Sequence, residues 1–442
     1  MLGRSTFALL ANLEKTQWLS RDQIEQLQLN RLTELLRIAH AHCPWHAERI
    51  QAAGLVLEPG RTLTLDEFRR LPTMTKADAS AHRERLVWRQ VPGGLHRFNT
   101  GGSSGQPLIF YYGRARQAAD VASRLRAHRW WGVEPGDPEV FLWGAPIELN
   151  GTDFLKTLRD RLFNQLLLNA FAMSEARMDD YLGTLQRFDP VNLFGYASSL
   201  ALLAAHAKRR GRIPRLKRLK LVCTTGEPLY PQQRRLIEEV FGVPVSNEYG
   251  CRDGGTIALE SPDGQLLVNS ETLLLEILDP QGRPVAPGEI GEAVITNLYS
   301  EAQPFIRYRT GDMVRRSAES CKAGRGLPVI AEVIGRTTDF IVRPDGTIMH
   351  ALAVIYVLRA IEGIDEFKII QPATDRLEVL IRPSPTWTDR AKDTIVGQLR
   401  QRMGSPVAVD IALVERIAPE ASGKHRYVVS HVALPDTLEL RE

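Results

Sequence analysis

Six short glycine-containing segments, in a fixed order, constrain this chain more than any other feature of its sequence. They are TGGSSGQP at residues 100–107, TGE at 225–227, YGCRD at 249–253, RYRTGD at 307–312, GRTTD at 335–339 and SGK at 422–424. Glycine lets a backbone N–H group approach a ligand closely and permits left-handed backbone conformations. Any one such segment is typical of a surface turn, but six in series indicate a site that handles a nucleotide.

The first of these segments has the composition of a phosphate-binding loop. Its backbone N–H groups can converge on an anion, and its hydroxyl side chains add further donors. The residues concerned are Thr100, Gly101, Gly102, Ser103, Ser104 and Gly105. The segment lacks the Gly-Lys-Ser/Thr ending of a Walker loop, which argues against a P-loop NTPase.

Length and composition exclude several other classes of protein. A chain of 442 residues predicts two or three domains, and contents of 43% hydrophobic and 24% charged residues are those of an ordinary globular protein. The net charge of +4 does not by itself imply a nucleic-acid partner. The four cysteines are too dispersed for a disulfide framework, no apolar run reaches the length of a membrane span, and no signal peptide is expected. We therefore expect a cytoplasmic protein.

The order of apolar and polar runs predicts an α/β domain followed by a smaller unit. Between residues 100 and 300, apolar strand-like runs alternate with amphipathic helical runs. Strands are expected at 139–143, 191–195, 219–224, 243–249 and 273–278, and helices at 20–43, 114–131, 176–187, 200–209 and 232–241. After residue 335 a hairpin with its turn at Asp345-Gly346 precedes further short strands and helices, which is typical of a small α+β unit.

The order of the six segments resembles that of the adenylate-forming ligase superfamily, in particular the branch of phenylacetate–CoA ligase and the capsule-biosynthesis ligases. The resemblance extends from about residue 95 to about residue 430. It implies an α/β fold with a large N-terminal adenylation domain of mixed sheets and packed helices at 1–334. A hinge at 335–339 and a small mobile α+β lid domain at 340–442 would follow.

The resemblance also implies roles for residues of the nucleotide site. Gly226 and Glu227 would line the adenine pocket, and Tyr249, followed by Gly250, would stack on the purine ring; a buried tyrosine at a strand end is an equally common explanation. Asp312 would accept hydrogen bonds from both ribose hydroxyls, which suits an acceptor-only carboxylate. Of Arg307 and Arg309, one would meet the nucleotide while the other forms a structural pair.

The resemblance also implies roles for residues of the lid, of the metal site and of the phosphate-binding loop. Arg336 would contact the nucleotide, and Asp339 would be the residue about which the lid rotates. Lys424 would be the adenylation lysine, a long cation that can reach into a site formed by another domain. Asp253 stands where the family usually has a glutamate associated with Mg²⁺, and Gln106 stands where many members have lysine. We therefore expect Mg²⁺ dependence with altered geometry and weakened contacts to pyrophosphate.

The acyl pocket is expected next to the segment FGYASS at residues 194–199. By resemblance Tyr196 would form a pocket wall, with Gly250, Gly254 and Gly255 opposite it. A tyrosine packed under the following helix is as common. The cysteine and histidine ligands of a structural zinc, which some relatives carry after the Tyr-Gly motif, are absent from residues 259–269, so no zinc is expected.

These features together predict an enzyme that uses ATP to convert a carboxylic acid into an acyl-adenylate and then transfers the acyl group to coenzyme A. An aromatic or arylacetic acid is favoured by the resemblance. One alternative is transfer to a carrier protein or an amine, with the basic run at 208–220 as a docking surface rather than a solvated helix end. Another is a nucleotide-binding protein that has lost its catalytic activity. No nucleic-acid partner is expected.

Overall fold

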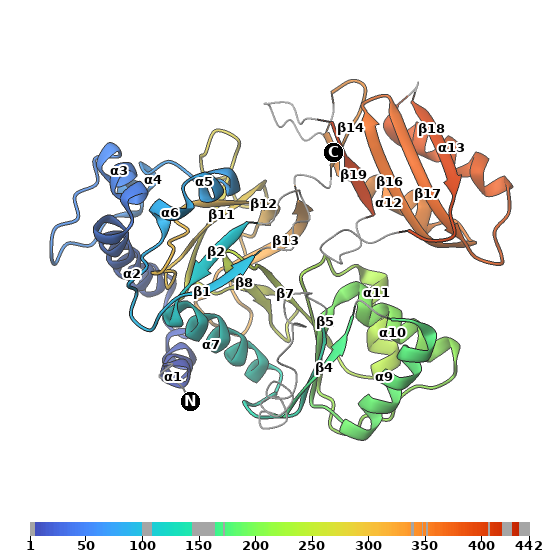
Figure 1. Cartoon of the computed structure of the whole chain (residues 1–442), viewed down its shortest axis with the longest axis horizontal. Helices are drawn as coiled ribbons and strands as arrows, with labels where there is room; N and C mark the ends of the chain where they lie inside the picture. The colour runs from blue at the N-terminus through green and yellow to red at the C-terminus, as the bar shows by residue number, and fades with distance from the viewer. Residues whose placement is uncertain are drawn as a thin grey trace. The chain divides into compact units, whose positions relative to one another are not determined.

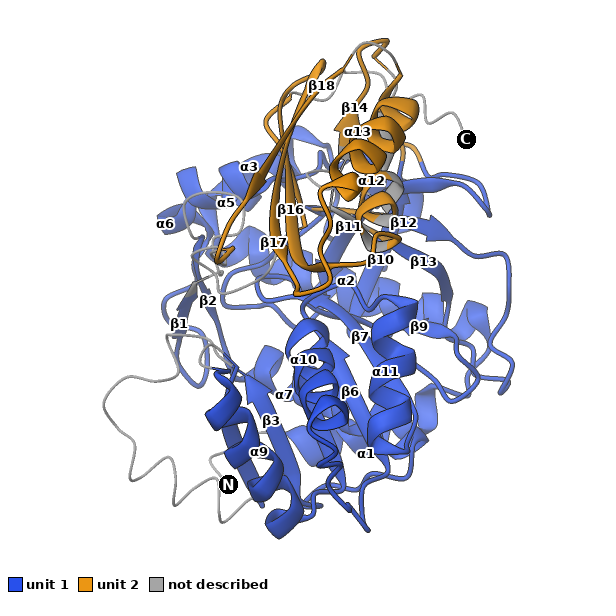
Figure 2. Ribbon diagram, turned by 90° about the vertical axis from the view of Figure 1, so that its right-hand side faces the viewer, with its two compact units in different colours: residues 1–278, 284–310, 314–333 blue, residues 279–283, 311–313, 334–442 orange. Residues whose placement is uncertain are grey.

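The computed structural model describes residues 5–99, 108–143, 164–170, 173–336, 340–346, 348–350, 352–404, 407–417 and 427–432. The chain forms two compact units (Figures 1 and 2). The first contains residues 1–278, 284–310 and 314–333, and the second contains 279–283, 311–313 and 334–442. No helix in the described ranges is long and apolar enough to cross a membrane. The mixed α/β fold class expected from the sequence is confirmed. The domain limits inferred from the resemblance remain predictions.

The helices of the first unit begin at residues that favour helix starts. Ser20 and Gln23 form a capping box at the start of α2, and Pro44 occupies the first turn of α3, so it ends one helix and begins the next. The helices are α1 Thr6–Thr16, α2 Arg21–His42, α3 Pro44–Ala52, α4 Leu65–Arg69, α5 Lys76–Ala81, α6 Arg83–Leu86, α7 Arg114–Trp130, α9 Glu175–Phe188, α10 Ala197–Arg209 and α11 Pro231–Phe241.

Within the described residues, a sheet of 11 strands has the order β10-β11-β12-β13-β9-β8-β7-β6-β5-β3-β4. Its strands are β3 Glu139–Trp143, β4 Gln165–Asn169, β5 Asn192–Tyr196, β6 Leu221–Thr225, β7 Val245–Cys251, β8 Gly255–Glu260, β9 Leu266–Val268, β10 Leu273–Leu278, β11 Ile290–Asn297, β12 Tyr308–Arg316 and β13 Val329–Arg336. The strands from β4 to β7 run parallel, and the pairing becomes antiparallel from β7 to β8. Strands β1 His96–Asn99 and β2 Ile109–Tyr112 form a separate hairpin.

Successive residues of a strand point to opposite faces of the sheet, so the parallel half has two different cores. On one face, Val140, Leu193 and Val222 join the core cluster that includes residues of α9, α10 and α11. On the other face, Phe141, Phe194 and Cys223 form a second cluster. The guanidinium of Arg124, from α7, lies 5.5 Å from the rings of both Phe141 and Phe194. Helix α7 therefore covers this second face.

One expected strand is shifted in the structure. The sequence predicted a strand at 243–249, but β7 begins at Val245 and continues to Cys251. Pro244 has no N–H group to donate, and beyond Tyr249 the chain stays extended because it pairs with β8 across the turn at residues 252–254. The Tyr-Gly motif thus lies within the strand rather than at its end.

The second unit has a four-stranded sheet of order β18-β17-β16-β19. Its core contains Val379 and Ile369 of the sheet together with Ile395 and Leu399 of a helix. The elements are β14 Phe340–Val342, β15 Ile348–His350, α12 Leu352–Arg359, β16 Ile364–Ala373, β17 Arg376–Pro383, α13 Arg390–Met403, β18 Ala408–Leu413 and β19 Val428–Ser430. The hairpin expected around Asp345-Gly346 is confirmed by the antiparallel pairing of β14 with β15.

Candidate active site

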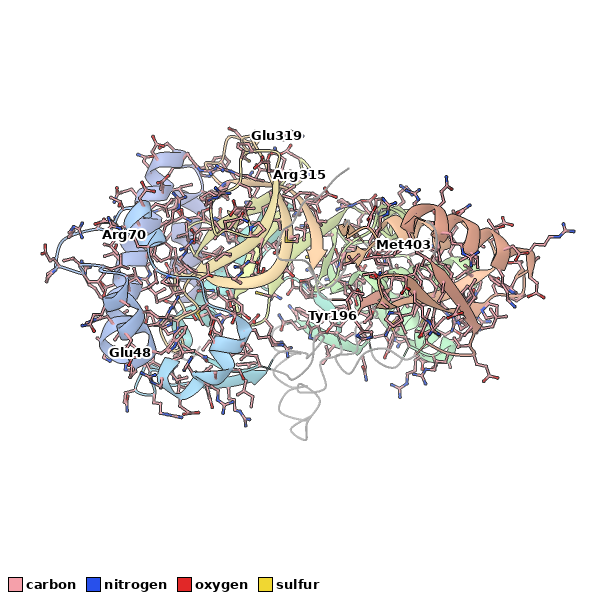
Figure 3. All side chains as sticks on the ribbon, turned by 90° about the horizontal axis from the view of Figure 1, so that it is seen from above. Glu48, Arg70, Tyr196, Arg315, Glu319 and Met403 are labelled. Atoms are coloured by element: carbon pink, nitrogen blue, oxygen red, sulfur yellow. The ribbon has the colours of Figure 1, made fainter. Side chains whose placement is uncertain are left out.

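Three adjacent parallel strands bring the central sequence motifs to one edge of the sheet. Tyr196 pairs in register with Thr225, and Thr225 pairs with Glu248. In-register residues of parallel strands point to the same face, so the three side chains form one row across β5, β6 and β7. Ligands of open α/β sheets bind at the carboxyl ends of the strands. This edge is therefore the candidate active site, and Tyr196 is labelled there in Figure 3.

Tyr196 and Gly226 fit closely against each other. The Tyr196 ring is buried and stacks on Trp143, with 4.2 Å between the ring centroids. Gly226 has a φ of +75°, and a Cβ atom there would lie 3.3 Å from Cε1 of Tyr196. The TGE segment therefore requires glycine both for its backbone conformation and for the space that the ring occupies.

Glu227 links the TGE segment to the start of α10. Its Oε2 accepts a hydrogen bond of 3.0 Å from the backbone N–H of Ser198, in the first turn of that helix. Tyr196, the N-cap residue, makes no side-chain cap of its own. A carboxylate at this position satisfies a free N–H group and opposes the positive end of the helix dipole. Glu227 thus joins two segments that the sequence assigned separately to the adenine and acyl pockets.

Tyr249 and Gly250 lie on β7, beside its antiparallel partner β8. Tyr249 is buried in the core cluster that includes Ile257 and Ile295. A Cβ atom at Gly250 would lie 2.7 Å from the backbone oxygen of Gly255, so only glycine fits between the two strands. The stacking of Tyr249 on a purine remains a prediction.

The turn between β7 and β8 is held by a buried arginine from α7. Arg116 is 1% exposed and donates hydrogen bonds to the carbonyl oxygens of Asp253, at 2.6 Å, and of Arg252, at 2.8 Å. The carboxylate of Asp253 accepts a hydrogen bond of 2.6 Å from the Tyr308 hydroxyl. Both the backbone and the side chain of Asp253 are thereby fixed.

Gly254 and Gly255 leave no room for a side chain. A Cβ atom at Gly254 would lie 2.1 Å from Cδ1 of Ile295. Gly255 has a φ of +99°, and a Cβ atom there would lie 2.9 Å from Oδ1 of Asp120 and 2.7 Å from Nδ2 of Asn297. The glycines expected opposite Tyr196 therefore pack against α7 and β11 in the described part of the chain.

Sequence reasoning missed a row of polar side chains on α7. Arg116, Asp120, Arg124 and His128 recur at every fourth position, a spacing that places them on one face of the helix and could have revealed them. Nε of Arg116 lies 3.4 Å from Oδ2 of Asp120, and Nδ1 of His128 lies 3.3 Å from Oε1 of Glu139. Burial raises the pKa of the Asp120 carboxyl, against the opposing charge of Arg116.

Both arginines of the RYRTGD segment form ion pairs. Arg307 is buried with a φ of +51°, and its guanidinium pairs with Glu276 at 2.9 Å. Arg309 pairs with Glu292. Each arginine thus has a carboxylate partner within the protein, and the contact of one of them with the nucleotide remains a prediction.

The remaining predicted site residues are described in part or not at all. Asp312 is buried on β12, and Arg336 ends β13 with only its backbone described. The predicted residues outside the described part of the chain are Thr100, Gly101, Gly102, Ser103, Ser104, Gly105, Asp339 and Lys424.

Asp253 is compatible with the Mg²⁺ role expected of it. Tyr308 occupies one of its carboxylate oxygens, and Mg²⁺ is commonly held by one or two carboxylates together with substrate phosphates. The described residues contain no group of three or more His, Cys, Asp or Glu side chains that could hold a metal by themselves. A site completed by phosphate oxygens fits this arrangement.

The basic run at 208–220 is largely ion-paired at the surface. Lys208 pairs with Glu239, Arg209 with Glu175, and Arg218 with Asp189. Arg210 and Arg212 both approach Asp179. This pairing reduces the positive charge that a docking partner would meet.

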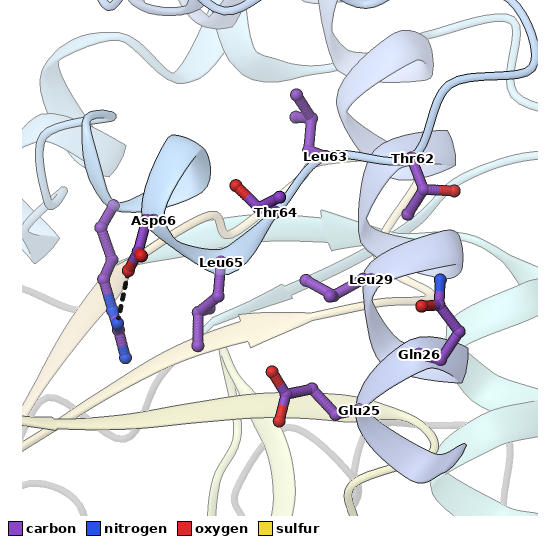
Figure 4. A pocket seen from close by; sticks show the side chains of 9 residues that line it. Glu25, Gln26, Leu29, Thr62, Leu63, Thr64, Leu65 and Asp66 are labelled. Atoms are coloured by element: carbon purple, nitrogen blue, oxygen red, sulfur yellow. Dashed lines mark hydrogen bonds and ion pairs between the residues drawn. The ribbon is translucent and has the colours of Figure 1, made fainter. Parts of the chain in front are cut away.

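A recess of about 420 Å³ lies between α2 and the segment at 62–69 (Figure 4). It is lined by Glu25, Gln26, Leu29, Thr62, Leu63, Thr64, Leu65, Asp66 and Arg69. None of the predicted site residues lines it, so it is separate from the candidate active site.

Comparison with known proteins identifies the relatives of this chain. Residues 341–431 match the CapK C-terminal domain. The chain is 24% identical to protein CapK of Staphylococcus aureus over 92% of this chain and 89% of that protein. It is 25% identical to phenylacetate-coenzyme A ligase of Escherichia coli strain K12 over 93% of this chain and 96% of that enzyme.

Solved structures share the fold. The crystal structure of 2-hydroxyisobutyryl-CoA ligase in the postadenylation state matches with a TM-score of 0.75 at 22% identity, covering 93% of this chain and 90% of that chain. The resemblance expected from the six segments is therefore confirmed: the chain is a relative of CapK and of the phenylacetate-coenzyme A ligases and has the fold of the adenylate-forming CoA ligases.

Proposed function

We propose that the protein activates a carboxylic acid with ATP and transfers the acyl group to coenzyme A. The observation that carries the proposal is the similarity to phenylacetate-coenzyme A ligase over nearly the whole of both chains. The row of motif residues at the carboxyl edge of β5, β6 and β7 supports it, because ligands of such sheets bind there.

The proposed reaction has two steps. A carboxylate oxygen of the acid attacks the α-phosphorus of ATP, and pyrophosphate leaves. The thiol sulfur of coenzyme A then attacks the acyl carbon, AMP leaves, and the thiol proton is lost. Catalysis of the first step depends on alignment of the reacting groups and on compensation of charge.

The described residues supply alignment in this proposal. Glu227 fixes the TGE segment to the start of α10, and Arg116 fixes the turn that carries Asp253. Asp312 would bind the ribose hydroxyls, and Lys424 would meet the charge that develops on the α-phosphate. Mg²⁺, held by Asp253, would neutralise phosphate charge when bound.

ATP–pyrophosphate exchange with a panel of aryl, arylacetic, aliphatic and amino acids tests the first step. At least one acid is expected to give exchange that depends on both ATP and Mg²⁺. Exchange with none of the acids would contradict acid activation and favour a protein that only binds nucleotide.

The acceptor is tested separately, with the acid that supports exchange. Addition of coenzyme A is expected to yield the acyl thioester and AMP in equal amounts. Exchange without thioester formation would instead indicate a carrier-protein thiol or an amine as the acceptor. A carrier protein and an amine can each be added as the acceptor in the same assay.

A further inference from the structure

Three charged side chains interact electrostatically on the α7 side of the candidate active site: Asp120 and Arg124 from α7 and Glu248 from β7. We call them the edge cluster. The Glu248 Oε1 atom accepts a hydrogen bond of 3.3 Å from the Thr225 hydroxyl. The Oε2 atom of Glu248 and the Nε atom of Arg124 are both buried and have no hydrogen-bond partner among the residues that the structure describes.

Aromatic rings border the edge cluster. The Arg124 guanidinium lies 5.5 Å from the rings of Phe141 and Phe194. Two residues further along the same strands and on the same face, Trp143 and Tyr196 stack on each other at 4.2 Å. The surroundings thus combine flat apolar surfaces with a few charged groups, a composition typical of small-molecule sites.

The edge cluster lies where the sequence places the acyl pocket. Asp120 approaches the Gly255 backbone, and Thr225 links Glu248 in register to Tyr196. The Asp120 side chain is 33% exposed, although burial raises the pKa of its carboxyl. Solvent therefore reaches the Asp120 carboxylate at this edge of the sheet.

A buried carboxylate oxygen that accepts no hydrogen bond is unfavourable. Burial raises the pKa of Glu248, against the opposing charges of Arg124 and His128. Removing charged oxygen from water without a hydrogen bond costs free energy, which is why most buried polar groups in proteins are paired. An acid with a purely hydrocarbon tail would leave the Oε2 atom of Glu248 unpaired, whereas an acid that carries a donor would satisfy it.

We propose that the acid activated by this protein carries a hydroxyl or amino group away from its carboxylate, and that this group donates a hydrogen bond to Glu248. The inference rests on the proposed function and narrows its substrate class. Aromatic side chains border the edge cluster, so the proposal covers substituted aryl acids as well as polar aliphatic ones. An unsubstituted aryl or arylacetic acid fits poorly.

The test compares phenylacetate with its hydroxy and amino derivatives at each ring position, and hexanoate with its terminal hydroxy and amino derivatives. ATP–pyrophosphate exchange gives kcat/KM for each acid. We expect at least one derivative to exceed its parent by roughly 100-fold or more, because a site built to hydrogen-bond a substrate rejects the analogue that lacks the group. The two series of derivatives distinguish a hydroxyl from an amino donor.

Substitutions then assign the preference to Glu248. Glu248→Leu is expected to reduce the ratio of kcat/KM for the derivative to kcat/KM for the parent acid to about one. Glu248→Gln keeps a hydrogen-bond acceptor and should retain part of the preference for the derivative. The matched control is Glu260→Gln on the neighbouring strand, since Glu260 is already paired with Arg234 at 2.7 Å. This change should leave the ratio unaltered. Thermal unfolding verifies that each variant is folded.

Binding of hydrolysis-resistant acyl-sulfamoyl adenosines, measured by calorimetry, separates failure of this inference from failure of the proposed function. If the unsubstituted acids supported exchange with a kcat/KM equal to or higher than that of every hydroxy and amino derivative, the inference would be overturned and acid activation would stand. An unchanged ratio in Glu248→Leu would also overturn it. If no acid gave exchange and no adenylate mimic bound, both would fail. Preferential binding of the mimics with donors would support the inference without turnover.

Discussion

The Tyr308 hydroxyl donates a hydrogen bond of 2.6 Å to Oδ2 of Asp253, which joins the end of the Tyr-Gly motif to the RYRTGD segment. Both residues are buried. The bond orients the carboxylate that we expect to serve Mg²⁺, while Arg116 holds the backbone of the same residue. Two predicted motifs are therefore coupled directly through their side chains.

Tyr308→Phe is expected to destabilise the protein by about 1–3 kcal/mol, since it leaves a buried carboxylate oxygen without its donor. It should also lower the rate of ATP–pyrophosphate exchange, because the Asp253 carboxylate loses its orientation. Urea unfolding and the exchange assay measure the two effects. The control is Tyr181→Phe on α9, which removes a hydrogen bond from the Tyr181 hydroxyl to the carbonyl of Asn169 at the end of β4. This control should affect stability alone. Equal activity in both variants would contradict the orienting role.

Asp312→Ala is expected to raise the KM for ATP more than the KM for the acid. Loss of a charged acceptor from the ribose hydroxyls costs about 1.5–3 kcal/mol, which corresponds to roughly a 10- to 150-fold weaker interaction. Steady-state kinetics with each substrate varied in turn makes the comparison. The control is Asp263→Ala in the exposed turn before β9. Parallel changes in both KM values would remove Asp312 from the nucleotide site.

Lys424→Ala is expected to slow acyl-adenylate formation on the order of 10²–10³-fold, the usual effect of removing one electrostatic contact from a transition state. Thioester formation from a supplied acyl-adenylate should be largely spared, because the lysine is expected to act only in the first step. Single-turnover measurements of each step separate them. Pyrophosphate release at the wild-type rate would refute the assignment of Lys424.

Arg126→Ala is expected to destabilise the first unit by about 3–5 kcal/mol, because it leaves a buried carboxylate without its partner. Arg126 is fully buried and donates to Glu271 at 2.6 Å and to Asn269 at 2.9 Å. The control is Arg209→Ala, which removes an exposed pair with Glu175 and should cost about 0–1 kcal/mol. Denaturant unfolding measures both losses of stability. Similar losses for the two variants would show that burial of the ion pair does not determine its contribution to stability.

His46 is expected to make the protein sensitive to acid. Its Nε2–H donates to the carbonyl of Pro304 at 2.8 Å, and its Nδ1 accepts from Arg49 at 2.9 Å, so the folded state holds the ring neutral. Burial, together with the charge of Arg49, lowers the pKa of His46 from 6.5 to about 3. The unfolded chain therefore binds a proton that the folded protein does not, and stability falls as the pH drops from 6.5 toward 3.

The measurement is the free energy of unfolding as a function of pH in wild type and in His46→Gln. Between pH 6.5 and about 3, the free energy of unfolding of wild type should fall by up to about 1.4 kcal/mol more per pH unit than that of His46→Gln. This difference corresponds to the uptake of one proton on unfolding. Above the window the two curves should run parallel, because the ring is neutral in both states. Identical slopes throughout would exclude His46 as the source of acid sensitivity.

The sequence by itself determined the class of fold and the position of the motifs along it. Local signals were sufficient for this: the apolar run at 139–143 became β3, the Asp345-Gly346 turn joined β14 to β15, and Pro44 separated α2 from α3. Such signals depend on spacing within a few residues, so they can be recognised without the partner segments. The order of the six glycine segments gave the family resemblance for the same reason.

Only the tertiary structure decided which side chains meet at the candidate active site. The extension of β7 through Gly250 depends on its pairing with β8, and the left-handed conformation of Arg307 accompanies its buried pair with Glu276. The proximity of Asp120 to Gly255 likewise involves residues far apart in the chain. Long-range packing and the pairing of buried charges fixed these features, and neither leaves a periodic signal in the sequence. The donor requirement inferred for the acid follows from that level of structure alone.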